Sequence, residues 1–103
     1  MATARWTVSG LNDLEDAARR FRRADTSESF RQHVHDAIER IEQFPMSGRM
    51  VPEYSLPELR EVVVGQFRMV YIVLDPEAVE IWSLISGRRD LRRHLGSDPR
   101  RIV

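Results

Sequence analysis

Arginine is the residue type through which this chain could do chemistry. All sixteen basic residues of the 103-residue sequence are arginines, and six of them lie in its last stretch: Arg88, Arg89, Arg92, Arg93, Arg100 and Arg101. A guanidinium group presents a planar fork of donors that suits carboxylate or phosphate, but it stays protonated near neutral pH. The arginines therefore indicate binding of anionic groups and not proton transfer. The alternative is that the last stretch is a solvated tail without a ligand.

The other polar side chains form no catalytic or metal-binding pattern. His33 and His35 lie two apart on a predicted helix, so their side chains diverge, and His94 stands alone among arginines. Glu61 could act as a base, but no well-placed acid accompanies it, and we expect Tyr71 to be buried. We therefore expect no catalytic residue, no metal site and no cofactor.

Arginines from separate segments could converge on one surface. Arg49 lies in a loop, Arg60 and Arg68 lie on strands, and Arg88 and Arg89 follow the last strand. The sequence gives no distances, so this convergence is a hypothesis. Arg68 is the one charge on an otherwise apolar strand, and an unpaired buried charge is costly. We expect its side chain to reach a groove, a carboxylate or water.

Three consecutive strands must position these arginines. The β-branched run at 59–64 ends at Gly65-Gln66 and 67–74 follows at once, which predicts a hairpin. Asp75-Pro76 has turn chemistry and precedes a third strand at 79–86. The result is an antiparallel meander.

The alternation of side chains predicts how the strands are buried. The strand at 67–74 is apolar on both faces except at Arg68, so it should be central. In the last strand, alternation places Trp82 and Leu84 on one face, and Ile81 and Ile85 on the other. The second face of the sheet is expected to be only partly covered.

The first half of the chain predicts one more strand and two helices. Residues 3–8 alternate as a short strand, and Ser9 can cap a helix that runs to about Arg23. A second helix starts within 25–28 and ends at Phe44-Pro45. Its apolar stripe contains five residues at helical spacing: Phe30, Val34, Ala37, Ile38 and Ile41.

Together these elements predict an α+β fold. A helical hairpin packs on a four-stranded, mainly antiparallel sheet, in the order β-α-α-β-β-β. Residues 46–57 form the only long irregular stretch, which could be functional or a plain connection. We expect a single domain over 1–103, with a core at 1–95 and a flexible tail at 96–103.

Composition limits the cellular setting. The chain is 42% hydrophobic and contains no cysteine, so it needs no oxidising compartment. No apolar run approaches the roughly 20 residues that span a bilayer, so we expect a cytoplasmic protein without membrane contact. A formal net charge of +0 argues against nucleic-acid binding through a broad electrostatic field.

The order of elements and several short motifs resemble the ParE/RelE superfamily of type II toxins. The terminal Gly-Arg-Arg-Asp-Leu favours the ParE-like branch. The chain departs from the family pattern at Gly10, where proline is common, and at Ser86, where histidine is common. The motifs cover nearly the whole chain: Ser9 with Asp13-Leu14, Phe44-Pro45, Gly48-Arg49, Pro52-Glu53, Leu59-Arg60, Arg68 with Tyr71, and Gly87-Arg88-Arg89-Asp90-Leu91.

This resemblance implies a toxin that a cognate antitoxin neutralises by wrapping a C-terminal segment around its surface. ParE-like members poison DNA gyrase, which needs binding and no catalysis, and DNA would be contacted only indirectly through the antitoxin. We expect the antitoxin to fill an apolar groove with an arginine rim. The candidate antitoxin- or target-binding residues are seven arginines: Arg49, Arg60, Arg68, Arg88, Arg89, Arg92 and Arg93.

Two alternatives remain open. A RelE-like ribosome-dependent mRNA endonuclease would use the arginine at position 68, but it would also need a proton-transfer group near the end of the last strand. Leu84-Ile85-Ser86 supplies none there. The other alternative is an inactive binding module descended from a toxin.

Overall fold

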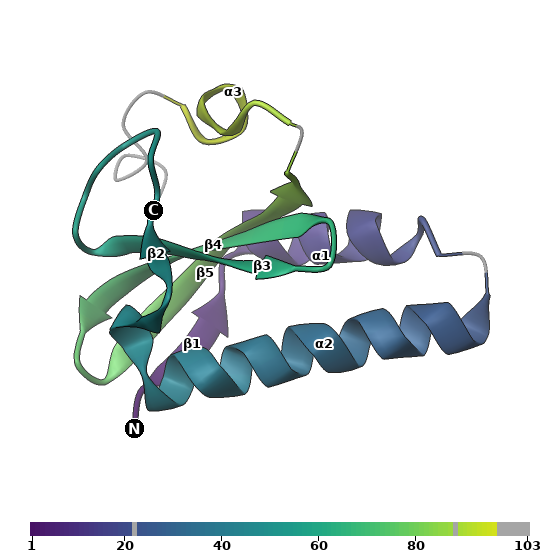
Figure 1. Ribbon diagram of the computed structural model, residues 1–103, viewed down its shortest axis with the longest axis horizontal. Coiled ribbons are helices and arrows are strands. Elements are labelled where there is room, and N and C mark those ends of the chain that lie inside the picture. Colours follow the sequence, from purple (N-terminus) through teal and green to yellow (C-terminus); the bar gives the residue numbers. More distant parts are fainter. Residues whose placement is uncertain (22, 88, 97–103) are drawn as a thin grey trace.

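A mixed five-stranded sheet organises the chain (Figure 1), and the computed structural model describes residues 1–21, 23–87 and 89–96. The strands are β1 (Thr3–Trp6), β2 (Arg49–Met50), β3 (Leu59–Val64), β4 (Phe67–Asp75) and β5 (Ala78–Ser86). The helices are α1 (Val8–Ala18), α2 (Ala24–Gln43) and α3 (Leu91–Leu95), with a 3-10 turn, η1 (Pro45–Ser47). The spatial order is β1-β5-β4-β3-β2, in which β1 runs parallel to β5 and the other pairs are antiparallel.

The predicted α+β fold is confirmed, with one more strand and one more helix than expected. β2 forms inside the stretch predicted to be irregular, where Arg49 and Met50 pair with Glu61 and Arg60. The two residues of β2 are too few to show an alternation of polar and apolar side chains, and the five residues of α3 are too few to show a helical period. Tertiary contacts, and not local pattern, therefore define both elements.

The first helix begins and ends earlier than predicted. Thr7, and not Ser9, is its N-cap, and the Thr7 hydroxyl accepts a hydrogen bond from the Gly10 N–H at 3.0 Å. β1 ends at Trp6, so Val8 opens α1 and is 77% exposed. The helix ends at Ala18 and not near position 23.

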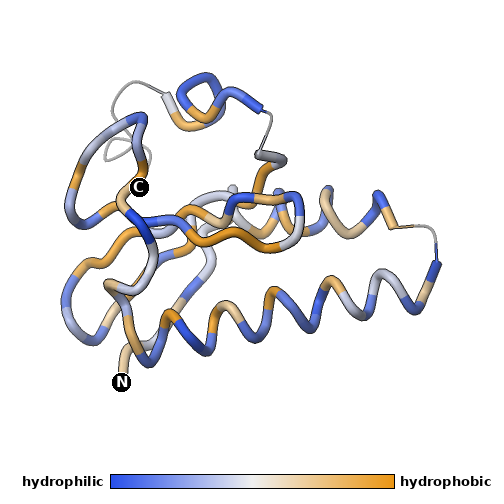
Figure 2. Tube along the Cα trace, viewed as in Figure 1, coloured by the Kyte–Doolittle hydropathy of each residue, from blue (hydrophilic) through white to orange (hydrophobic). Residues whose placement is uncertain are grey.

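Both long helices pack against the same face of the sheet. The predicted apolar stripe of α2 is confirmed, because Phe30, Val34 and Ile41 are buried and Ala37 and Ile38 are partly buried against this core. The strands of the sheet center are largely apolar, whereas α2 alternates polar and apolar residues along its length (Figure 2). The remaining buried members come mainly from β4 and β5: Phe67, Met69, Tyr71, Val79, Ile81 and Leu84.

A bulge in β5 reverses the predicted alternation of its side chains. Tyr71 pairs with Ile81 but Val70 pairs with Ser83, so Trp82 is an extra residue in the strand. As a result Leu84 lies in the helix-facing core, while Trp82 lies in the core of the opposite face. The prediction that Trp82 and Leu84 share a face is therefore wrong.

The second face of the sheet is closed by the chain itself. The segment after β2 and the helix α3 lie over it, and Leu91 and Leu95 of α3 are buried. Among the described residues, this face therefore leaves no open apolar surface for the predicted groove. The buried residues beneath this cover come from β3, β4 and β5 and from the segment after β2: Val51, Leu59, Val70, Ile72, Trp82 and Ile85.

Tyr71 joins the sheet to the turn after α2. The side chain is fully buried, as predicted, and its burial raises the pKa of the Tyr71 hydroxyl. This hydroxyl donates to the Pro45 carbonyl at 2.7 Å and accepts from the Gly48 N–H at 3.0 Å. A Cβ at Gly48 would lie 2.5 Å from the Tyr71 hydroxyl and 2.7 Å from the Glu61 carbonyl oxygen. The backbone can approach this closely only because position 48 is glycine.

We predict that Gly48→Ala lowers the free energy of unfolding by about 1–3 kcal/mol, because the added methyl group overpacks a rigid site. Urea denaturation followed by circular dichroism measures this change. Gly87→Ala is the matched control, since the nearest atom to its added Cβ is 3.6 Å away. Equal stability of the two variants would contradict the close approach at Gly48.

Candidate functional site

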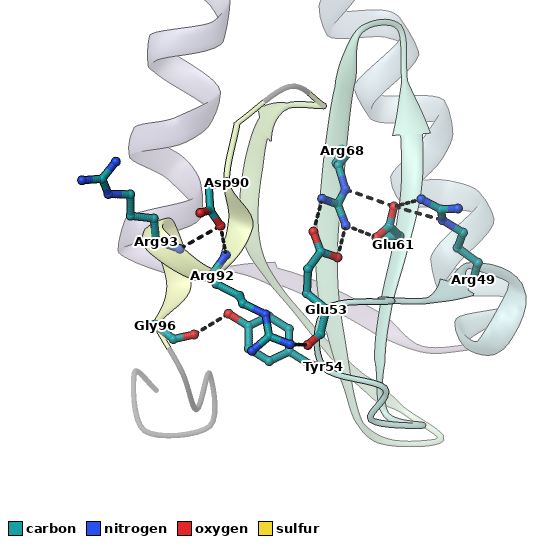
Figure 3. A network of polar contacts seen from close by, with 9 residues as sticks. All are labelled: Arg49, Glu53, Tyr54, Glu61, Arg68, Asp90, Arg92, Arg93 and Gly96. Atoms are coloured by element: carbon teal, nitrogen blue, oxygen red, sulfur yellow. Dashed lines mark hydrogen bonds and ion pairs between the residues drawn. The ribbon is translucent and has the colours of Figure 1, made fainter.

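A buried carboxylate on β3, Glu61, organises a polar cluster on the second face of the sheet (Figure 3). Its side chain is 0% exposed. Arg49 donates to Oε2 from Nε at 3.1 Å and from a terminal nitrogen at 3.0 Å. Arg68 donates from Nε to Oε2 at 3.2 Å and from a terminal nitrogen to Oε1 at 2.5 Å. Two guanidinium groups thus neutralise one carboxylate that has no access to water.

Arg68 also binds a second carboxylate of the same chain. Its two terminal nitrogens donate to the Glu53 oxygens at 2.7 and 2.8 Å, which is a bidentate pair. The hydrogen bonds that Arg68 donates to Glu53 and Glu61 raise the pKa of Arg68 above its already high usual value. The hydrogen bond from Arg68 is the largest cause that lowers the pKa of Glu53, against the opposing effect of burial. The expectation that Arg68 reaches a carboxylate is confirmed, and its donors are occupied by its own chain.

The cluster continues to α3 through backbone and aromatic contacts. Arg92 donates to the Glu53 carbonyl, and its guanidinium lies 5.5 Å from the centre of the Tyr54 ring. The Tyr54 hydroxyl donates to the Gly96 carbonyl, and burial raises the pKa of Tyr54. Arg92 therefore fastens α3 to the segment after β2.

A second buried carboxylate, Asp13 of α1, holds α3 from the other side. Its Oδ2 accepts hydrogen bonds from the Ser83 hydroxyl at 3.0 Å and the Leu84 N–H at 3.1 Å. The same oxygen lies 2.8 Å from His94 Nε2. β1 pairs with β5 only as far as Ile81. The Leu84 N–H, further along β5, therefore has no partner on β1 and donates to Asp13 instead. One oxygen thus joins α1, β5 and α3.

Sequence reasoning missed the contact between Asp13 and His94. The two residues are 81 positions apart, so no local spacing connects them. The available signal was the place of Asp13 between Gly10 and Ala17 at helical spacing, which puts a carboxylate on the buried face of α1.

A cleft of about 360 Å³ lies beside α3 and is lined by Arg89, Asp90, Arg93 and His94. The Asp90 carboxylate caps α3 by accepting hydrogen bonds from the Arg92 and Arg93 N–H groups at 3.1 and 3.4 Å. Arg89 and Arg93 are exposed. Within the described part of the chain, their side chains form no ion pair or hydrogen bond.

The predicted arginines do not converge on a single ligand site. Arg49 and Arg68 meet at Glu61, whereas Arg60 donates to the backbone carbonyls of Pro57 at 2.7 Å and Gly48 at 3.1 Å. Arg92 tethers α3, and Arg89 and Arg93 line the separate cleft. Arg88 lies outside the described residues, and so does the predicted tail beyond Gly96. Binding roles for these arginines stay predictions.

Two adjoining clefts form a groove on the other side of the molecule, between α2 and β3. Their volumes are about 470 and 450 Å³, and both include His33 and Gly65. The β3 residue Val63 is 69% exposed in this region. The groove also contains charged residues of the helices and aromatic residues of the core: Arg20, Phe21, Phe30, Asp36, Arg40 and Phe67.

The two edges of the sheet differ in how they are protected. The edge at β1 is covered, because the Ala4 N–H donates to the Glu42 carboxylate at 2.9 Å and the Ala2 N–H to the Glu42 carbonyl at 2.8 Å. At the opposite edge, β2 pairs only with Arg60 and Glu61. Among the described residues, Val62 to Val64 therefore have no strand partner on their outer side.

Neither a metal site nor a membrane span is formed by residues 1–21, 23–87 and 89–96. No three His, Asp or Glu side chains of this part lie close enough to hold a metal ion. No helix in it is long and apolar enough to cross a bilayer.

Comparison with known proteins gives one family. The sequence model of the family described as "ParE toxin of type II toxin-antitoxin system, parDE" matches residues 4–91. A solved structure described as "Chromosomal ParDE TA system from P. aeruginosa" is similar with a TM-score of 0.66 at 15% identity, over 84% of this chain and 96% of that chain. At this identity the structural likeness shows a shared fold. No curated protein matches this chain by sequence.

We predict that Arg68→Met lowers the free energy of unfolding by about 3–5 kcal/mol, because it leaves a buried carboxylate short of a partner. Arg19→Met is the control. Arg19 pairs with Asp16 at the surface, where its side chain is 73% exposed, so its loss should cost less than about 1 kcal/mol. Chemical denaturation at neutral pH compares the two, and similar losses would contradict the role of Arg68.

We further predict that the contribution of Glu53 to stability is lost in acid. The folded state lowers the pKa of Glu53 below its usual value of 4.5, so the folded chain binds this proton less readily than the unfolded chain. The stabilisation is therefore complete above about pH 4.5 and disappears as the pH falls through the lowered value. Denaturation at several pH values should show a smaller acid dependence in Arg68→Met than in the wild type.

Proposed function

Because the chain belongs to the ParE toxin family of type II toxin-antitoxin systems, we propose that it inhibits DNA gyrase in the cytoplasm without catalysis and is neutralised by a cognate antitoxin. The observation that supports this proposal best is the occupation of Arg68 by Glu53 and Glu61. An arginine that stabilises a cleaved phosphate must have donors free for it. Here the strand arginine expected of a nuclease is already bound on both sides.

The proposed contact surface for the target lies at α3. Arg89 and Arg93 are exposed there, whereas Arg49, Arg60, Arg68 and Arg92 have partners within the chain. Arginines without a competing carboxylate can bind a partner without first breaking an ion pair within the chain. Any contact with DNA would then be made indirectly, through the antitoxin.

The groove between α2 and β3 is the proposed binding site of the antitoxin. An extended segment could pair with the free edge at Val62 to Val64, and its apolar side chains could cover Val63. The charges of Asp36 and Arg40 in the wall of the groove would fix the direction of that segment.

A RelE-like mRNA endonuclease is the second candidate, and one observation favours it. Asp13 orients the imidazole of His94, which lies beside Arg89 and Arg93. A histidine held by a carboxylate is a common general base. We place this candidate second because the other acidic side chain of the cleft, Asp90, caps α3, and the arginines beside it do not transfer protons.

We predict that the purified chain inhibits gyrase supercoiling and does not cleave mRNA on translating ribosomes. His94→Gln should not abolish supercoiling inhibition, because no proton is transferred, although His94 helps to hold α3 through Asp13. Ribosome-dependent cleavage that is lost in His94→Gln, with supercoiling untouched, would establish the endonuclease instead. Growth that is unaffected by expression without antitoxin would indicate an inactive module.

We predict that Val63→Glu weakens antitoxin binding at least about tenfold, since it places a charge at the apolar edge of the groove. The antitoxin would be taken from the neighbouring open reading frame, and calorimetry would measure its affinity. Val8→Glu is the control, because Val8 is 77% exposed at the start of α1 and not part of the groove. Equal affinities of both variants would place the antitoxin elsewhere.

A further inference from the structure

The cleft beside α3 supports an inference that rests on the proposed function and deepens it. We propose that this cleft binds a carboxylate side chain from an acidic segment of the protein target. Its walls are Arg89, Asp90, Arg93 and His94, around a volume of about 360 Å³. That space suits one or two side chains and not a folded element.

Two arginines border this cleft, and neither forms an ion pair with a described residue. Arg93 points away from the network around Glu61 and from the other labelled side chains (Figure 3). The Arg89 side chain forms no ion pair or hydrogen bond in the described part of the chain either, and both residues are exposed. Like charges that share a cleft repel each other, and a bound carboxylate removes that repulsion.

The carboxylates nearest to the two arginines make other contacts, and no ion pair joins them to Arg89 or Arg93 within the described part of the chain. Asp90 accepts hydrogen bonds from the N–H groups that open α3. Asp13 accepts from Ser83, Leu84 and His94, and its side chain is only 10% exposed. Among residues 1–21, 23–87 and 89–96, no carboxylate forms an ion pair with Arg89 or Arg93, so both guanidinium groups can bind a carboxylate of another molecule.

The walls of the cleft are held in place before a ligand arrives. An ionised carboxylate only accepts hydrogen bonds, so His94 Nε2 carries the proton that it donates to Asp13 at 2.8 Å. Leu91 and Leu95 are buried beneath α3, which fixes the backbone on which Arg93 stands. A prearranged site loses less conformational entropy on binding.

A protein carboxylate fits this cleft better than a nucleic-acid backbone. Nucleic acid is bound by an extended basic stripe that follows successive phosphates. Here Asp90 interrupts the positive charge, and the whole chain has a formal net charge of +0. Two arginines around one cleft match a glutamate or aspartate side chain.

The test uses the full chain labelled with nitrogen-15 and a peptide of four glutamates as the probe. Signals of Arg89 to Gly96 should shift on titration, and a peptide of four glutamines should shift none of them. The double variant Arg89→Gln with Arg93→Gln should bind the glutamate peptide at least about tenfold more weakly. Arg19→Gln with Arg31→Gln makes the same change in net charge on α1 and α2 and should bind as the wild type does.

The same variants separate this inference from the proposed function. If gyrase is the target, the α3 double variant should need at least about tenfold more protein for half-inhibition of supercoiling, and the control should not. Full inhibition by the α3 variant would overturn the inference while leaving gyrase as the target. Peptide shifts outside α3 would overturn it too, as would tighter binding of a single-stranded oligonucleotide to these residues. No inhibition by the wild type would remove the gyrase proposal, whatever the peptide result.

Discussion

The ionised Glu61 side chain, placed where water cannot reach it, is the constraint on which the second face of the sheet depends. A buried charge is tolerated only with close partners, and Arg49 and Arg68 supply them from the strands on either side. Arg68 has more N–H donors than the Glu61 carboxylate can accept, and the Glu53 carboxylate accepts hydrogen bonds from its terminal nitrogens. Because Arg92 binds the Glu53 carbonyl, α3 is drawn over the same face. A chain of polar contacts thus determines how the apolar residues beneath are covered.

Elements with a long hydrophobic pattern could be predicted from the sequence. The stripe of α2 and the central strand β4 have apolar residues at regular spacing, and burial follows from that spacing. The bulge at Trp82 could not be predicted, because an extra residue leaves no mark in a strand that is apolar on both faces. The two-residue β2 and the five-residue α3 are likewise shorter than any period.

The sequence predicted which types of residue form the candidate site better than it predicted how these residues are arranged in space. An arginine alone on an apolar strand required an anion, and Arg68 has two. Glu61 was within reach of this reasoning, because it lies on the neighbouring strand and shares its face with Arg68 through Val70. Glu53 lies in an irregular segment, and Asp13 meets His94 only through the tertiary fold. For such pairs, distance along the chain conceals proximity in space.

The pairing of β1 with β5 has a consequence for how the chain folds during its synthesis. β1 is made first, yet its strand partner spans Ala78 to Ile81, and the histidine that contacts the Asp13 carboxylate follows 81 positions later in the chain. Contacts between such distant residues carry a large entropic cost of closure and slow folding. A growing chain on the ribosome can form α1 and α2 early, but it cannot complete the sheet until β5 has been translated. The five-stranded sheet therefore forms only after Ser86 has been added, and a premature stop codon anywhere before α3 leaves the second face without part of its cover.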